Sequence, residues 1–307
     1  MGVPGRQCFH APGIIAGMRV LLASEPGRAG RPNEDFAAAV PGAVVLLDGA
    51  GYEPASGIGC VHGVAWYART LGGLLAAGAC DDQVPLAELL GRGIEQVNRM
   101  HAGTCDLGHP ATPGATVIIA RQRGDTLDYL VLCDSVLVLR PRRGEPRGLT
   151  DTQLGEITAR FRPKASLAAG TPEHDAAWRA YSRGLEAARN QPGGFWLAAA
   201  DPAAADHALT GSEPLAALSA VALLSDGASR LADRFHLAGW AEVCDILARD
   251  GPAGLVQRVR AAESADPDGE RWPRSKIHDD ATAVFWPIPD LRLRALGSRS
   301  HGASLGR

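Results

Sequence analysis

Acidic residues stand at the borders of short apolar runs at several places in the chain. Residues 44–47 lead directly into Asp48 and Gly49. Residues 221–224 lead through one serine into Asp226. A buried strand that ends in a carboxylate holds that side chain rigidly, and a glycine after it lets a ligand approach the backbone carbonyl. Further acidic residues at such borders are Glu34, Asp35, Asp134, Asp279 and Asp280.

Carboxylates that converge on one point repel one another unless a cation neutralises them. A ligand set made only of oxygen atoms favours a hard divalent ion, Mg²⁺ or Mn²⁺, over zinc. Each Asp-Gly pair taken alone is equally typical of a turn. The residues by themselves therefore leave both interpretations open, a metal site or a set of unrelated turns.

The composition of the chain is that of an ordinary globular protein. Its 307 residues include 31 basic and 34 acidic side chains, a balance that does not favour nucleic-acid binding. Its apolar runs are shorter than the roughly 18 residues that span a bilayer, so we expect no membrane association. The six cysteines are scattered without a Cys-x-x-Cys pair. This spacing predicts buried thiols in the cytoplasm rather than disulfides or zinc ligands.

Short runs of β-branched residues or leucine predict the strands. These runs are residues 18–24, 43–47, 115–121, 128–133, 135–140, 195–199, 220–224 and 282–286. The runs 115–121 and 128–133 flank a Gly-Asp turn, which predicts a hairpin that 135–140 continues as a meander.

Apolar residues that recur every three or four positions predict the helices. The first helix has an apolar face that starts at Val61 and ends at Leu75, and residues 86–97 form its antiparallel partner. A third helix should begin at Thr171 and Pro172. Its apolar face would hold Trp178, Tyr181, Leu185 and Ala188. Residues 240–248 and 252–262 predict another helix pair.

Strands in hairpin groups with paired helices between them favour an α+β fold with largely antiparallel sheets. We expect one domain over residues 18–290, a loose Gly/Pro-rich segment over 1–17 and a polar tail over 291–307.

Taken in order, the motifs resemble the type 2C metal-dependent protein serine/threonine phosphatases in their short bacterial form. The resemblance covers residues 18–287. The matching pieces are Asn33-Glu34-Asp35-Phe36, Leu47-Asp48-Gly49-Ala50-Gly51, Gly114-Ala115-Thr116, Cys133-Asp134-Ser135, Ser225-Asp226-Gly227 and Asp279-Asp280-Ala281-Thr282. The family fold consists of two packed antiparallel sheets flanked by antiparallel helix pairs, an αββα sandwich.

The resemblance implies a centre of two Mg²⁺ or Mn²⁺ ions that activates a water for attack on phosphoserine or phosphothreonine. The residues it assigns to these ions are Asp48, which would bridge them, the carbonyl of Gly49, Asp226 and Asp279. Secondary or water-mediated positions are Glu34, Asp35 and Asp134, the last of these for a third, weaker ion. The implied substrate is a phosphoprotein, and a serine/threonine kinase would oppose the enzyme.

Three departures from the family pattern concern the phosphate, the proton donor and the third ion. Gly30 stands where many relatives have a phosphate-binding arginine, and the nearby candidates are Arg28 and Arg31. Ala50 stands where some relatives have a histidine, and the candidate general acids are His62 and His278. Cys133 and Val136 replace the usual glycine and arginine around Asp134, which bears on the third ion alone.

Two alternative functions remain open at the level of sequence. A catalytically silent binding or regulatory relative would be expected to lack a metal carboxylate, and none is missing. A small-molecule phosphatase would use the same chemistry. Residues 150–194, where the family carries a flap near the cleft, match weakly and leave the substrate open.

Overall fold

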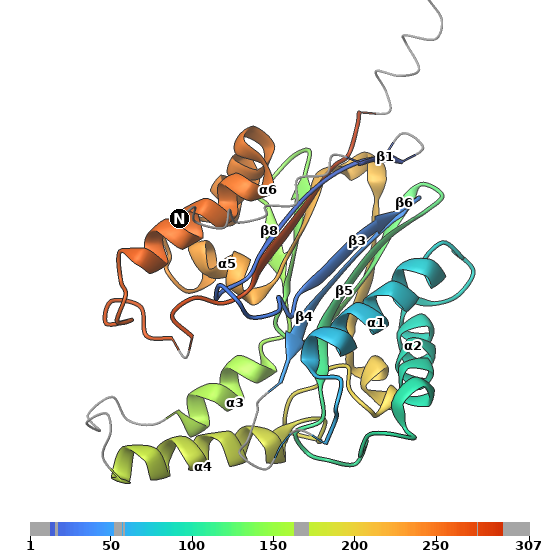
Figure 1. The fold of residues 1–307 in the computed structure, drawn as a ribbon. Coiled ribbons are helices and arrows are strands. Elements are labelled where there is room, and N and C mark those ends of the chain that lie inside the picture. Colours follow the sequence, from blue (N-terminus) through green and yellow to red (C-terminus); the bar gives the residue numbers. More distant parts are fainter. Residues whose placement is uncertain are drawn as a thin grey trace, which may run out of the picture.

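The computed structural model describes residues 13–15, 18–51, 57, 59–162, 172–274 and 276–290. The polar tail expected over 291–307 and most of the segment expected over 1–17 lie outside these residues. Two antiparallel sheets pack face to face, with helices on both outer sides (Figure 1). This arrangement confirms the α+β sandwich. Within the described part of the chain, no helix is both long enough and apolar enough to cross a membrane.

The first sheet has six strands in the order β1-β2-β11-β10-β7-β8. Their bounds are Gly13–Ile15 for β1, Met18–Glu25 for β2, Val136–Pro141 for β7, Arg147–Leu149 for β8, Leu218–Leu224 for β10 and Ala281–Pro287 for β11. The second sheet has five strands in the order β3-β4-β5-β6-β9. Their bounds are Phe36–Val40 for β3, Ala43–Ala50 for β4, Gly114–Arg123 for β5, Thr126–Leu132 for β6 and Leu209–Pro214 for β9.

Side chains that alternate along each strand contribute to two cores, one between the sheets and one between a sheet and its outer helices. In β4, Val44 and Leu46 face the other sheet, whereas Val45 and Leu47 face the outer helices. Successive side chains of a strand point to opposite faces, so a strand covered on both sides is apolar at every position. This explains why the central strands appear in the sequence as continuous apolar runs.

Helix pairs cover the outer faces of the two sheets. α1 (Val64–Gly78) and α2 (Leu86–His101) pack on the second sheet. α5 (Asp226–Asp233) and α6 (Trp240–Ser264) pack on the first. α6 covers the predicted helix pair as one element, kinked where Gly251 adopts a φ of 73°. Gly251 and Pro252 mark the break that the sequence indicated.

α3 (Gln153–Phe161) and α4 (Pro172–Ala188) pack together at one end of the sandwich (Figure 1). Leu154 of α3 and Leu185 of α4 contact a small apolar cluster that includes Cys133 and borders Ala50. α3, α4 and the segment 195–199 therefore pack together beside Ala50, where β4 ends. Two short 3₁₀ helices, Pro202–His207 and Leu215–Ala217, flank β9.

The hairpin of β5 and β6 is confirmed, but the predicted meander is wrong. β7 leaves the second sheet and pairs with β10 and β8 of the first. Cys133 between β6 and β7 has a φ of 69°, a left-handed conformation that turns the chain. Residues 136–139 are all buried. A strand is buried at every position when both faces of its sheet are covered, as they are for β7 between β10 and β8.

Two other predictions are also corrected. Residues 195–199 are buried but form only isolated bridges, to Arg189 and to Ala115, instead of a strand. Val61 is 77% exposed and precedes α1, so it is not on the apolar face of that helix. The structure also adds α3, α5 and β9, which the sequence pattern did not predict. β9 is an exposed polar edge strand, so it lacks the apolar signal of the other strands.

Candidate metal centre

Asp48 and Gly49 lie at the end of β4, inside the sheet. They pair with Thr116 and Ala115 of β5, and the Asp48 N–H donates to the Thr116 hydroxyl at 3.3 Å. A Cβ on Gly49 would lie 2.6 Å from the backbone oxygen of Glu34 and 2.7 Å from a methyl carbon of Val64. Only glycine fits this point, where the residues after β2 and the start of α1 close around the strand end.

Asp226 reaches the same point from the first sheet, where it opens α5 directly after β10. Its backbone N–H donates to Oδ2 of Asp48 at 3.2 Å. The preceding Ser225 hydroxyl accepts the N–H of Thr282 at 2.9 Å, which joins the end of β10 to the start of β11. A Cβ on Gly227 would lie 1.9 Å from the carbonyl oxygen of Asp280, so this glycine allows α5 to approach residues 279–280 closely.

Asp279 completes the group from the segment before β11. Its two carboxylate oxygens face two cations, Lys276 at 2.7 Å and Arg230 at 2.9 Å. Arg230 is almost fully buried and also pairs with the buried Glu263 at 2.7 Å. The sequence reasoning missed Lys276 and Arg230. Arg230 follows Asp226 by four positions on a helix, a spacing that places both side chains on one face.

Asp35 and Asp280 have opposite surroundings although each adjoins a predicted ligand. The carboxylate of Asp280 accepts the backbone N–H groups of Gly27 and Glu34, each at 2.7 Å. It thereby fastens the loop after β2 to the site. Both carboxylate oxygens of Asp35 are buried, and none of the described residues donates a hydrogen bond to them in good geometry, although the Thr282 and Ser225 hydroxyls are close enough to lower the pKa of Asp35. Buried polar atoms are rarely left without a partner, so Asp35 marks a place suited to a cation.

The acidic side chains at this point disfavour one another's charge. Burial raises the pKa of Asp35 to about 7, and the charges of Asp280 and Asp226 add to the rise. Burial and the charges of Asp35, Asp226 and Asp279 raise the pKa of Asp48 well above its ordinary value. The pKa of Asp279 is also raised, first by burial and then by Asp226.

Asp134 belongs to the same electrostatic group. Burial, followed by the charge of Asp226, raises its pKa to about 7. A divalent cation would relieve these costs by pairing with the ionised carboxylates. The oxygen donors, their burial and the unpartnered oxygens of Asp35 all fit a hard ion such as Mg²⁺ or Mn²⁺.

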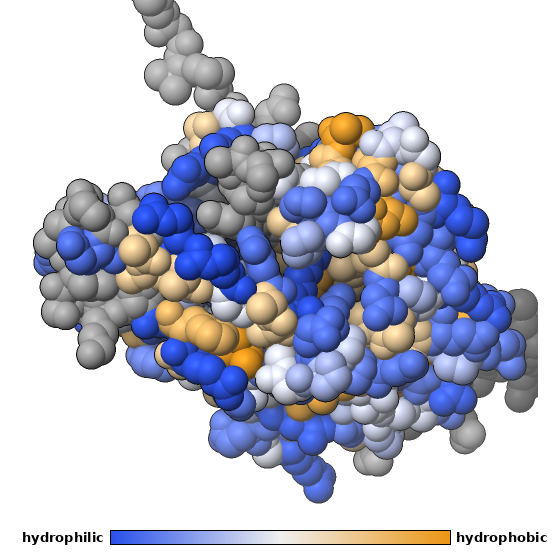
Figure 2. Space-filling model, turned by 90° about the horizontal axis from the view of Figure 1, so that it is seen from below, coloured by the Kyte–Doolittle hydropathy of each residue, from blue (hydrophilic) through white to orange (hydrophobic). Residues whose placement is uncertain are grey.

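A cleft of about 820 Å³ borders Asp279 and Glu34. The predicted phosphate-binding residues Arg28 and Arg31 line it, as do His62 and His278. Seen from below the view of Figure 1, this end of the molecule is hollowed and mostly hydrophilic (Figure 2). The structure thus brings the weaker candidates of the sequence analysis to the same cleft.

The two candidate general acids have different surroundings. Nδ1 of His278 lies 2.8 Å from Oε2 of the buried Glu263, a contact that orients its ring. Nδ1 of His62 lies 3.3 Å from the sulfur of Cys105 and 3.7 Å from that of Cys60. The His62 ring is therefore held by a group of sulfur and nitrogen atoms beside the cleft.

The sequence prediction of simple buried thiols is correct for Cys133 and Cys244 but wrong for others. Cys80 is exposed, and Cys60 and Cys105 are half-buried with their sulfurs 3.5 Å apart. Cys8 lies outside the described residues. A Cys-x-x-Cys pattern does not contain this pair, because its members are 45 residues apart and each is near a histidine in the sequence instead of near another cysteine.

Residues 27–260 match the family described as Protein phosphatase 2C. Three solved structures have a similar fold. They are PppA of Pseudomonas aeruginosa (18% identity, TM-score 0.53, 89% of this chain and 98% of that chain covered), the serine/threonine phosphatase PstP of Mycobacterium tuberculosis (19%, 0.51, 88% and 98%) and the serine/threonine phosphatase Stp1 of Staphylococcus aureus (12%, 0.57, 94% and 100%). No curated protein matches this chain.

An αββα sandwich with carboxylates from both sheets at one end defines the metal-dependent phosphatases of this architecture. The match extends over most of the chain and includes β3, β4 and β10 with the acidic residues that follow or precede them. The chain belongs to the protein phosphatase 2C family.

Proposed function

We propose that the chain is a metal-dependent phosphoprotein phosphatase that hydrolyses phosphoserine and phosphothreonine by attack of an activated water. The observation that carries this proposal is the convergence of Asp48, Asp226 and Asp279 from three segments of the chain. The unpartnered oxygens of Asp35 support it, because they add a buried acceptor that a cation would satisfy.

Two Mg²⁺ or Mn²⁺ ions bound here would supply a water of lowered pKa and would offset charge on the phosphoryl oxygens. The residues proposed to hold them are Asp48, the carbonyl of Gly49, Asp226 and Asp279, with Glu34 and Asp35 in additional or water-mediated positions. Asp134 is proposed for a third, weaker ion. Lys276 would have to release or share its oxygen of Asp279 when an ion is bound there.

The remaining residues of the cleft would bind the substrate and transfer the proton. The guanidinium groups of Arg28 and Arg31 are suited to phosphoryl oxygens because they present several N–H donors in one plane. His278, whose ring is oriented by Glu263, would protonate the leaving alkoxide oxygen of the serine or threonine.

The proposal extends to the domain, the substrate and the location of the protein. We assign residues 18–290 to one catalytic domain, supported by the apolar core that both sheets share. A phosphoprotein substrate, opposed by a serine/threonine kinase, is supported by the open hydrophilic end in Figure 2. A cytoplasmic location is supported by the five free cysteines of the described residues.

The test is hydrolysis of p-nitrophenyl phosphate and of a phosphothreonine peptide by the purified chain, with Mn²⁺ and with EDTA. We expect turnover of both substrates that needs Mn²⁺ and is lost in Asp226→Ala. Asp245→Ala is the matched control, because Asp245 is exposed and pairs with Arg140, away from the carboxylate centre. Turnover that persists in EDTA, or in Asp226→Ala with Mn²⁺, would overturn the metal mechanism. Turnover of the small ester without the peptide would favour a small-molecule phosphatase.

A further inference from the structure

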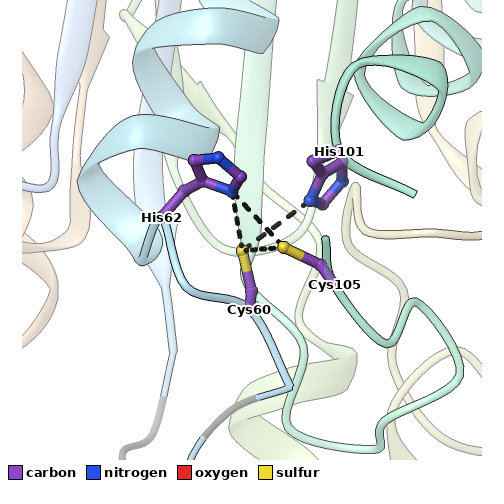
Figure 3. A group of neighbouring side chains, drawn as sticks. All are labelled: Cys60, His62, His101 and Cys105. Atoms are coloured by element: carbon purple, nitrogen blue, oxygen red, sulfur yellow. Dashed lines mark hydrogen bonds between the residues drawn. The ribbon is translucent and has the colours of Figure 1, made fainter. Parts of the chain in front are cut away.

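Two cysteines and two histidines meet beside the start of α1, outside the carboxylate centre (Figure 3). We call this group the Cys₂His₂ cluster, and its members are Cys60, His62, His101 and Cys105. Each side chain offers one ligand atom, and these atoms all lie within 4.8 Å of one another. Figure 3 shows the four side chains pointing inward to a common centre from two segments of the chain.

Four of the six separations between these atoms are close to the edges of a zinc-centred tetrahedron. The two sulfurs are 3.5 Å apart, and Nδ1 of His62 lies 3.3 Å from Cys105 and 3.7 Å from Cys60. Nδ1 of His101 lies 3.7 Å from the Cys60 sulfur. A tetrahedral zinc ion with bonds of about 2.3 Å to sulfur and about 2.0 Å to nitrogen has ligand-to-ligand edges of about 3.3–3.8 Å.

The cluster consists of two pairs of residues, each from one segment of the backbone: Cys60 with His62, and His101 with Cys105. Cys105 donates its N–H to the carbonyl of His101 at 3.0 Å, so the last turn of α2 continues and the two side chains share a face. Cys60 and His62 are two residues apart in the segment that leads to α1. The Asp106 N–H donates to the carbonyl of Gly59 at 2.7 Å and ties the two segments together.

The surroundings of the cluster restrict its histidine rings. Trp66 stacks on His62 with ring centres 4.3 Å apart, and its ring lies 5.1 Å from that of His101. His101 is buried. The donors are therefore already held in place before any ligand binds, as a binding site requires.

We propose that one Zn²⁺ binds here as a structural ion, with four ligands: Cys60, His62, His101 and Cys105. Thiolate and imidazole donors select zinc over Mg²⁺ and Mn²⁺, which prefer oxygen. Four protein ligands fill a tetrahedral shell and leave no position for substrate, which makes the site structural rather than catalytic.

A disulfide between Cys60 and Cys105 is the competing use of the two sulfurs. It would give no role to two imidazoles whose nitrogens face those sulfurs at 3.3–3.7 Å. A zinc ion uses all four side chains, so the geometry favours the metal.

The position of the site gives the ion a structural consequence. His62 lines the cleft, and Val64, two residues later, lies against Gly49 and Gly51, where an added Cβ would meet its side chain. Zinc would fix residues 59–63 to the end of α2 and so hold the start of α1 against the end of β4. This inference is independent of the proposed phosphatase activity, because it concerns different residues and a different kind of ion.

The test is the zinc content of the full-length chain, purified under reducing conditions without chelator and measured by mass spectrometry of the metal. We expect about one zinc per chain, lost in Cys105→Ser and retained in Cys80→Ser. Cys80 is the matched control because it is exposed and lies outside the cluster. Asp48→Asn should also retain the zinc, which separates this ion from any bound at the carboxylate centre.

Cobalt substitution supplies a readout of the donor atoms. Co²⁺ bound in place of zinc should give the thiolate charge-transfer band and intense visible bands of a tetrahedral site. Because His62 is exposed, His62→Asn should fold. We expect its affinity for Co²⁺ to be lower than that of the wild type by more than about 100-fold. Loss of a residue that only hydrogen-bonds to a metal ligand typically costs about 10–100-fold, so a larger loss indicates that His62 itself is a ligand.

Three results would overturn the proposal. They are a reduced wild-type chain that neither contains nor takes up zinc, a Co²⁺ complex without thiolate bands, and a Cys60–Cys105 disulfide that forms in the presence of zinc.

Discussion

At the scale of single residues, the acidic positions look alike in the sequence but have different partners in the fold. Asp280 binds two backbone N–H groups, Asp279 faces two cations, and Asp35 has buried oxygens without a donor among the described residues. The resemblance of the motifs to the family implied that Asp279 and Asp35 would lie at a common metal centre. It could not predict their distant partners, because Arg230 and the N–H of Gly27 come from segments that only the folded chain brings next to residues 279–280.

The pH dependence of stability tests the electrostatic cost of Asp35. Its folded pKa of about 7 lies above its ordinary value of 3.8, so the folded chain binds the proton more tightly than the unfolded chain. The unfolding free energy of the metal-free protein should therefore fall as the pH rises from about 4 to about 7. Asp35→Asn should reduce this fall by a few kcal/mol, because one pKa unit is worth about 1.4 kcal/mol.

The measurement is urea unfolding in EDTA at pH 5 and pH 7.5. The exposed Asp245→Asn serves as the control and should keep the full fall. An equal fall in wild type and Asp35→Asn would contradict the assigned cost. Excess Mn²⁺ should raise the stability of the wild type most at the higher pH, where the carboxylates are ionised.

At the scale of elements, the sequence predicted those strands and helices whose apolar pattern is set by one simple environment. The strands β4, β5, β10 and β11 are covered on both sides and appear as apolar runs. The same reasoning gave the wrong sheet for the residues after Leu132. The apolar pattern of β7 shows that the strand is buried, but it does not show to which sheet the strand belongs. Residues 195–199 were mistaken for a strand for a related reason: they are buried between the core of the second sheet on one side and α3 and α4 on the other, but they form only isolated bridges.

Gly49 tests how tightly the elements close around the site. In Gly49→Ala the added Cβ would meet the backbone of Glu34 at 2.6 Å and the side chain of Val64 at 2.7 Å. We expect a loss of about 1–3 kcal/mol in unfolding free energy, the usual cost of overpacking. Urea unfolding in EDTA measures this loss without any contribution from bound metal.

The matched control is Gly73→Ala in α1, where nothing lies within 4 Å of the added carbon. This variant should gain up to about 1 kcal/mol, because alanine favours a helix over glycine. Equal stability of Gly49→Ala and wild type would show that the strand end is looser than the structure indicates.

At the scale of the whole molecule, the sandwich separates two kinds of metal donor. Its sheets bring oxygen donors together at one end, through Asp48 of the second sheet and Asp226 after the first. The outer pair α1 and α2 brings sulfur and nitrogen donors together beside the same cleft. Hard and soft ions would therefore bind to different sites of one chain, with His62 lining the cleft that also borders Asp279.

The order of the elements and the acidic motifs was predictable because both depend on local sequence. The Cys₂His₂ cluster was not predicted, although Cys-x-His before α1 and His-x₃-Cys at the end of α2 are visible in the sequence. Their pairing depends on α1 and α2 packing side by side on the second sheet, and a search for closely spaced cysteines does not test that.

The most direct test of the central claim is a calorimetric titration with Mn²⁺ of the chain freed of Mg²⁺ and Mn²⁺, performed on wild type, Asp48→Asn and the control Asp245→Asn. Zinc should be left in place at the Cys₂His₂ cluster during this titration. We predict two Mn²⁺ per chain for wild type and the control, and weak or absent binding for Asp48→Asn, because Asp48 is proposed to bridge both ions. Unchanged binding in Asp48→Asn would contradict the assignment of this carboxylate cluster as the metal centre.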